Sequence, residues 1–168
     1  MREKAGVSYS IFFLVEIYDL TKKKRSIPSR KKVQKNKKRK IQVVVMTKKE
    51  LLLLKTKEER GSFWQNITGG VKKEETFKEG ALRELYEESG IFEGKIKYIG
   101  LIFEFKDKRS REVKEKSYLC LLDEKPPKIQ IDSHEHQSYQ WIEHQEVDES
   151  KFGHYTNFLA YLGAKSLL

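Results

Sequence analysis

Residues 69–91 read GGVKKEETFKEGALRELYEESGI, and this stretch decides the fold. Its apolar side chains recur at helical spacing, which predicts a helix over about residues 76–89. On that helix Glu84, Glu87 and Glu88 share one arc of roughly 100°, because residues three and four apart are neighbours. The apolar stripe expected to pack against the core lies beside this arc and consists of Phe77, Ala81, Leu82 and Leu85.

The three carboxylates of this helix crowd against a face that turns toward the core. They repel one another and lose hydration there, so a cation has to offset their charge. Hard divalent ions suit such a cluster of oxygen ligands, and Mg²⁺ suits it best when phosphates complete its coordination shell. The helix therefore predicts a site for a divalent ion that meets a phosphate-containing ligand.

The residues that flank this arc fit the same interpretation. Gly69 and Gly70 break the preceding strand and let the backbone approach a ligand closely. Gly90 follows the last helical turn and is expected to act as a C-cap glycine. Arg83 stands four residues before Glu87, so we expect it to pair with that carboxylate and hold it in place.

The stretch matches, at every defined position, the signature of the Nudix hydrolases, G-x5-E-x7-R-E-U-x-E-E-x-G-U, where U is a bulky aliphatic residue. The matching residues are Gly69, Glu75, Arg83, Glu84, Leu85, Glu87, Glu88, Gly90 and Ile91. A solvated acidic helix with a glycine cap would not require this full spacing. The resemblance implies an α/β fold, the Nudix α/β/α sandwich with a mixed β-sheet. It also implies an enzyme that hydrolyses a nucleoside diphosphate linked to another moiety.

Roles for individual residues follow from this resemblance. It implies that Glu84, Glu87 and Glu88 are ligands of Mg²⁺, for which Mn²⁺ can substitute, and that Arg83 orients them. Glu75 belongs to the signature but lies on another side of the helix, so we expect a structural role for it. The base that deprotonates the attacking water stays open between a carboxylate of this helix and one from another loop.

A second source of carboxylates is the segment DSHEHQSYQWIE, residues 132–143. It resembles an acidic, histidine-bearing segment that leads into a tryptophan strand in the family. In the dihydroneopterin triphosphate pyrophosphatase branch, a glutamate at the position of Glu135 contributes to the metal site. Glu135 is therefore a catalytic candidate, and an exposed polar loop is the equal alternative. His134 and His136 lack a third ligand for zinc, so we expect both to be solvated.

Two further segments resemble the same branch, and the whole resemblance covers about residues 41–165. FWQNITGGV at residues 63–71 matches the lead into the signature. The chain from SYQWIE to HYTNFLAYL matches a tryptophan strand followed by an Asn-bearing terminal helix. Relatives commonly carry an arginine near the position of Thr56, and its absence here weakens any expectation of a phosphate contact at that point.

The residues expected to contact the substrate are Phe63, Trp64, Gly69 and Gly70. The two aromatic side chains either stack on a pterin or purine or pack in the core. The resemblance favours dihydroneopterin triphosphate or a related nucleoside triphosphate as the substrate. Dinucleoside polyphosphates of the Ap4A type, damaged nucleotides and RNA 5′ ends are alternatives within the family. A non-catalytic nucleotide-binding module is the alternative from a different class.

The net charge of +10 is unevenly distributed along the 168 residues. Residues 1–40 carry 14 Lys/Arg against 3 Asp/Glu, whereas residues 41–168 carry 21 against 22. We therefore expect a largely disordered basic extension over residues 1–40 and one Nudix hydrolase domain over residues 41–168. Residues 21–40 have the charge to contact RNA or an anionic surface, and a solubilising or non-native extension is the alternative. The apolar SIFFLVEIY before them is either an added strand or a consequence of the choice of start site.

Composition also bears on the cellular compartment. The single cysteine, Cys120, lies in the apolar run YLCLL, so we expect a buried small hydrophobic residue and no disulfide framework. The longest apolar run, residues 11–15, is too short to span a membrane. These features predict a cytoplasmic protein without a transmembrane segment.

The remaining elements are expected on both sides of the signature helix. Short strands are predicted over residues 41–47, 51–56, 63–68, 95–105, 117–122 and 139–142. A terminal helix is predicted from the spacing of Phe158, Leu159, Tyr161 and Leu162. This order of strands and helices predicts a mixed sheet between helices.

Overall fold

The computed structural model describes residues 37–92 and 95–168. The expectations for a basic extension and for an added strand near its start concern residues 1–36, which lie outside the described residues. The first described strand begins at Lys38, so the ordered domain takes in the last three residues that the charge pattern assigned to the extension.

Seven strands and two α-helices make up the described chain. In sequence order they are β1 (Lys38–Met46), β2 (Glu50–Thr56), β3 (Trp64–Gln65), β4 (Ile67–Gly70), α1 (Phe77–Ser89), β5 (Ile96–Lys106), β6 (Glu112–Leu121), β7 (His136–Glu143) and α2 (Tyr155–Lys165). Two short 3-10 helices, η1 (Glu58–Arg60) and η2 (Glu149–Lys151), lie in the connections. Every expected strand is present, but residues 63–68 form parts of two strands rather than one.

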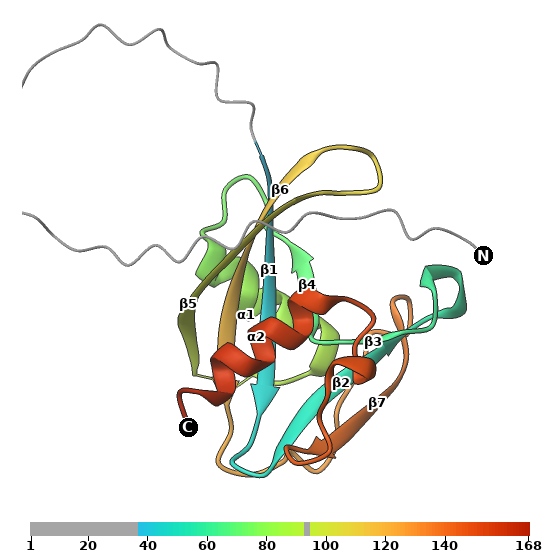
Figure 1. Cartoon of the computed structure of the whole chain (residues 1–168), viewed down its shortest axis with the longest axis vertical. Coiled ribbons are helices and arrows are strands. Elements are labelled where there is room, and N and C mark those ends of the chain that lie inside the picture. Colours follow the sequence, from blue (N-terminus) through green and yellow to red (C-terminus); the bar gives the residue numbers. More distant parts are fainter. Residues whose placement is uncertain (1–36, 93–94) are drawn as a thin grey trace, which may run out of the picture.

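The strands form one mixed sheet with β1 near its centre (Figure 1). The order is β3-β2-β1-β6-β5, with β4 also paired to β1 and β7 also paired to β2. The β1–β6 pair is parallel, and the other pairs are antiparallel. A central position suits β1, since its sequence IQVVVM is apolar on both faces.

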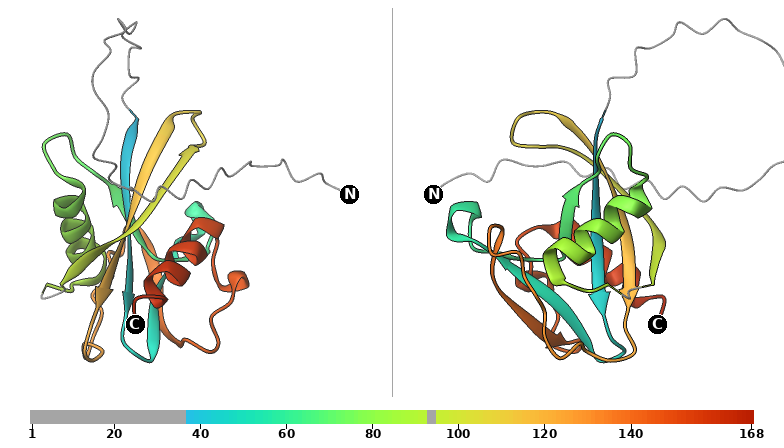
Figure 2. Two further views of the ribbon diagram at one scale, coloured as in Figure 1. Left: turned by 60° about the vertical axis from the view of Figure 1, so that its left-hand side comes forward. Right: turned by 180° about the vertical axis from the view of Figure 1, so that it is seen from behind.

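The two helices cover opposite faces of the sheet, which gives the expected α/β/α sandwich (Figure 2). Because side chains alternate along a strand, β1 contributes to two cores. On the α1 side Val43 and Val45 pack with Leu85. On the α2 side Val44 and Met46 pack in a second cluster with Ala160, Tyr161 and Ala164.

The boundaries of α1 agree with those expected from the sequence. Thr76 accepts a hydrogen bond from the backbone N–H of Glu79, and the Glu79 side chain accepts one from the backbone N–H of Thr76, which forms a capping box. Gly90 ends the helix with φ of 71°, a left-handed conformation that favours glycine. The expected apolar stripe is wrong at one position, because Leu82 is 38% exposed on the outer side of the helix.

Cys120 is fully buried in the α1-side core, as its apolar surroundings predicted. Burial raises the pKa of its thiol to about 12. Neither α-helix of the described ranges has the length and apolar character that a membrane crossing requires.

Candidate active site and metal centre

Arg83 on α1 joins the carboxylates of the signature. Its Nε donates to Glu75 Oε1 at 2.6 Å, and its Nη1 donates to Glu84 Oε1 and to Glu87 Oε2, each at 2.8 Å. Its Nη2 donates to the carbonyl oxygen of Gly70 at 2.8 Å, which ties the helix to the end of β4. The predicted Arg83–Glu87 pair is therefore present as part of a larger network.

Glu75 fixes this guanidinium from the loop that precedes α1. Its carboxylate also accepts a hydrogen bond from the backbone N–H of Lys72 at 2.9 Å. The bonds from Arg83 and Lys72 lower the pKa of Glu75 to about 2. Both oxygens of Glu75 accept hydrogen bonds from Arg83, so Glu75 holds Arg83 in position.

Gly69 makes room for Glu84. A Cβ at Gly69 would lie 1.9 Å from Cδ of Glu84, so the site tolerates no side chain there. A Cβ at Gly70 would meet no atom within 4 Å. The two glycines thus differ, since Gly69 allows the Glu84 carboxylate of α1 to approach the sheet and Gly70 borders open space. Burial raises the pKa of Glu84, and the hydrogen bond from Arg83 opposes that effect.

Glu88 points into the protein and pairs with a histidine from β7. Its Oε2 lies 3.0 Å from Nε2 of His136, and both residues are almost fully buried, with exposures of 3% and 1%. Burial raises the pKa of Glu88 to about 7, and the hydrogen bond with His136 acts in the opposite direction.

The expectation that His136 is a solvated loop residue is therefore wrong. The strand expected to begin at residue 139 begins at His136, which pairs with Thr56 of β2 and is enclosed there. His134, by contrast, is exposed as expected. The sequence analysis missed that the strand pattern, in which side chains alternate between the two faces of the sheet, continues upstream of Tyr139 to His136.

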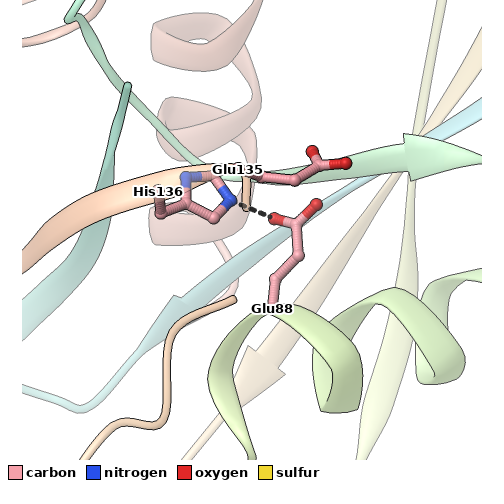
Figure 3. Close-up of side chains that lie close together, drawn as sticks. All are labelled: Glu88, Glu135 and His136. Carbon is pink, nitrogen blue, oxygen red and sulfur yellow. Dashed lines mark hydrogen bonds and ion pairs between the residues drawn. The ribbon is translucent and has the colours of Figure 1, made fainter. Parts of the chain in front are cut away.

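Glu135 comes from the loop before β7 and reaches the same place (Figure 3). Single ligand atoms of Glu88, Glu135 and His136 all lie within 4.8 Å of one another. Arg60 of η1 pairs with Glu135 at 2.8 Å, although both side chains are partly exposed. Glu135 therefore lies near Glu88 of α1, and its catalytic role stays a prediction.

The donor set fits a divalent cation. Glu84 and Glu88 both have raised pKa values because they are buried and because Glu135 lies near them. A divalent ion would offset this repulsion, and carboxylate oxygens are the ligands that Mg²⁺ and Mn²⁺ accept. Glu84, Glu88 and Glu135 could hold such an ion from the inner side. Glu87 is half exposed and held by Arg83 at the outer edge.

A pocket of about 560 Å³ opens beside these carboxylates. Glu84 and Glu135 line it together with Gly69, Gly70 and Phe63. Its cationic lining residues are Lys38, Lys40, Arg60 and Lys108. The sequence analysis placed Lys38 and Lys40 in the basic extension and did not single out Arg60 or Lys108. A cavity with carboxylates and ammonium groups suits a ligand that carries phosphates together with metal ions.

The two aromatic residues expected to contact substrate lie in different environments. Phe63 lines the pocket, and its ring packs edge to face against His154 with centroids 4.8 Å apart. Trp64 packs against the α2-side core, and the Lys55 ammonium lies 5.8 Å from its ring centroid. The structure therefore brings together three of the four expected substrate-contacting residues at the pocket, and Trp64 lies apart from them.

A mixed sheet between two helices, with an arginine-linked set of glutamates on one of them, defines a class of hydrolases that act on phosphoanhydride bonds. A family model described as the NUDIX domain matches residues 37–162, and the chain belongs to the Nudix family. Enzymes of this family typically use divalent metals.

Several solved structures share this fold. The E. coli dihydroneopterin triphosphate pyrophosphohydrolase has 22% sequence identity and a TM-score of 0.63, over 74% of this chain and 93% of that one. A C. elegans Ap4A hydrolase has 23% identity and a TM-score of 0.59, over 74% and 97%. The NUDIX domain of Shewanella oneidensis NrtR, solved with ADP ribose, has 15% identity and a TM-score of 0.66, over 83% and 94%. No curated protein sequence shows significant similarity to this chain.

Proposed function

We propose that this protein is a Mg²⁺-dependent pyrophosphohydrolase, with Mn²⁺ able to substitute, that acts on dihydroneopterin triphosphate or a related nucleoside triphosphate. The observation that carries the proposal is the composition of the 560 Å³ pocket, where Glu84 and Glu135 share one cavity with four cationic side chains. A ligand that carries several negative charges and binds metal ions would complement both sets of groups.

Different residues of this site bind the phosphates and the metal. Lys38, Lys40 and Lys108 neutralise phosphate oxygens and orient the chain of phosphates. Glu84, Glu87 and Glu88, with Glu135 from the opposite loop, hold the metal. When bound, a divalent ion supplies positive charge to the phosphate oxygens and lowers the pKa of coordinated water.

The attacking water loses its proton to a carboxylate oxygen of the site. Glu135 is one candidate for this base, because it comes from outside the helix, lines the pocket and is partly exposed. Glu84 and Glu87 are the candidates on α1, where Arg83 holds both in fixed positions. The Arg83 guanidinium donates hydrogen bonds to these carboxylates, and its role is to orient them.

The second candidate substrate is a dinucleoside polyphosphate of the Ap4A type, and the crowding of cations at the pocket mouth favours it. Lys38 is exposed, yet its pKa is lowered by partial loss of hydration and by the nearby charges of Arg111, Lys40 and Arg109. A cluster of cations that repel one another is stabilised by a long anionic chain. The fold shared with the C. elegans Ap4A hydrolase is consistent with this candidate. Damaged nucleotides and RNA 5′ ends remain further candidates of the same chemistry.

A substrate panel tests the proposal directly. Purified protein is incubated with dihydroneopterin triphosphate, GTP, ATP, Ap4A and 5′-triphosphorylated RNA in Mg²⁺, in Mn²⁺ and in a chelator, and the products are separated by ion-exchange chromatography. We expect pyrophosphate from a nucleoside triphosphate, and only with metal present. Unequal cleavage of Ap4A as the main activity would favour the second candidate, and hydrolysis that survives chelation would contradict both.

A further inference from the structure

The α2-facing side of the sheet contains buried polar residues where a core would ordinarily be apolar. Along β6 the side chains that face α2 include Leu119 in the core and, two and four residues earlier, Ser117 and Glu115. On β1 the residue level with Ser117 is Gln42. The exposed fractions of Glu115, Ser117 and Gln42 do not exceed 3%, so this end of the layer is polar and buried.

These groups form a connected network that ends in α2. Lys40 Nζ lies 3.5 Å from Glu115 Oε1, and Gln42 Nε2 donates to Glu115 Oε2 at 3.3 Å. Asn66 Nδ2 donates to Gln42 Oε1 at 3.2 Å, and the backbone N–H of Asn66 donates to Asn157 Oδ1 at 2.8 Å. Among the described residues, Asn66 Oδ1 of this network and the neighbouring Ser117 Oγ have no hydrogen-bond partner.

Such a network costs stability compared with apolar packing. A buried carboxylate loses hydration, and one ammonium at 3.5 Å with one amide does not fill all of its acceptor sites. Burial accordingly raises the pKa of Glu115 in spite of Lys40. A polar cluster that stability does not explain is expected where the protein meets a ligand.

Glu115 lies at a second pocket, of about 360 Å³, that adjoins the first. Phe105, His154 and Asn157 line it together with Glu115. The two pockets share Lys40, Gln65, Thr68, Lys108 and His154. Because these residues line both pockets, one extended ligand can occupy both.

We propose that the second pocket binds the heterocyclic end of the substrate, and that Glu115 selects a ring with a ring N–H beside an exocyclic amino group, the edge shared by guanine and pterin. The inference rests on the proposed function, in that the phosphates of the same molecule occupy the first pocket. It assigns a specificity-determining residue that lies outside the signature helix and the loop before β7.

The hydrogen-bonding pattern gives the reason for this selectivity. An ionised carboxylate only accepts hydrogen bonds, and its two oxygens match two adjacent N–H donors. Hypoxanthine offers the ring N–H without the amino group, and adenine offers a ring acceptor beside its amino group. Adenine would therefore leave the buried carboxylate facing a lone pair, which is strongly unfavourable. Phe105 supplies an aromatic wall of the pocket, and burial together with nearby Lys40 and Lys108 lowers the pKa of His154, which also lines it.

The test measures binding of GDP, IDP and ADP to the full-length protein by calorimetry. In wild-type protein the affinity should fall in the order GDP, IDP, ADP, with GDP bound about tenfold or more tightly than ADP. Glu115→Gln should reduce the GDP:ADP affinity ratio by about tenfold, because its amide opposes one of the two donors. Glu112→Gln, at the exposed start of the same strand, should leave the ratio unchanged.

The outcomes separate this inference from the proposed function. Equal affinities of the wild-type protein for GDP and ADP would overturn the inference even if both triphosphates are hydrolysed, and this comparison needs no variant to fold. A Glu115→Gln protein that folds and keeps the wild-type ratio would overturn it as well. Selective GDP binding that Glu115→Gln reduces, without turnover of any triphosphate, would instead contradict the proposed function and leave the recognition by Glu115 supported.

Discussion

His136 Nε2 lies 3.0 Å from Glu88 Oε2, and both side chains are almost fully buried. When Glu88 is ionised, its carboxylate oxygen accepts a hydrogen bond and His136 Nε2–H donates it, and Nδ1 has no partner among the described residues. The other Glu88 oxygen points toward the side where Glu135 lies (Figure 3). His136 therefore fixes the orientation of a carboxylate proposed to hold the metal, as groups behind metal ligands commonly do.

Replacement of His136 should weaken metal binding. We expect His136→Leu to reduce Mn²⁺ affinity by about 10–100-fold, because Glu88 loses the donor that orients it. His136→Gln places an amide N–H near the position of Nε2 and should recover most of that affinity. Electron paramagnetic resonance of free Mn²⁺, titrated with substrate-free protein, measures the effect.

Two controls separate this orienting role from a general effect on folding. His134→Leu changes the exposed neighbour and should bind Mn²⁺ as the wild type does. Thermal melting reports the stability of each variant. Equal Mn²⁺ affinity in the wild-type and His136→Leu proteins would show that the hydrogen bond to Glu88 is irrelevant to metal binding.

Glu135 should act on the rate rather than on the stability. Glu135→Gln keeps the shape and removes the charge, so the fold should survive. If Glu135 is a metal ligand or the base, kcat falls by about 10²-fold or more while KM changes little, since the loss falls on the transition state. Steady-state kinetics with Glu58→Gln as a control from the neighbouring 3-10 helix gives the comparison. If kcat and KM both stay within about twofold of wild type, the general base is a carboxylate of α1 instead.

The two glycines before the helix should respond differently to alanine. A Cβ at Gly69 collides with Glu84, whereas a Cβ at Gly70 meets open space. We therefore expect Gly69→Ala to displace the carboxylate and lower kcat by about tenfold or more, because small misplacements in a site are costly. Gly70→Ala should cause a clearly smaller loss. Equal kcat values for the two variants would contradict the close approach of Gly69 to Glu84.

Stability should depend on pH through Glu75. Its folded-state pKa is lowered to about 2 by Arg83 and by the Lys72 backbone, from an ordinary value of 4.5. A lowered carboxylate pKa stabilises the fold above pH 4.5, and that contribution is lost as the pH falls from 4.5 toward 2. Thermal melting of wild type and Glu75→Gln should thus show a gap at pH 6 that narrows at pH 3. A gap that is constant with pH would argue against this origin.

The sequence predicted α1 closely because the signals for it are local. Thr76 with Glu79 marks its start, Gly90 marks its end, and the spacing of the glutamates fixes their common face. The position of Glu135 near Glu88 could not be predicted from local signals, because the two residues lie far apart in the chain. Only the family resemblance indicated that Glu135 belongs to the site.

Other parts of the site depend on the register of the sheet. The burial of His136 follows from where β7 begins, and a strand boundary that is wrong by three residues hid it. The burial of Glu115 follows from the parallel pairing of β1 with β6, which places it level with Lys40. Neither strand pairing nor the packing of α2 can be read from the periodicity of one segment.

The central claim is that the carboxylates of α1 carry out metal-dependent hydrolysis, and the kcat of two variants tests it most directly. At saturating Mg²⁺ and the best substrate of the panel, Glu84→Gln and Glu87→Gln should each lower kcat by a factor on the order of 10² or more, as the loss of a metal ligand or base would. Glu74→Gln, an exposed carboxylate just before the helix, should turn over like the wild type. Near-wild-type kcat in both folded helix variants would contradict the account.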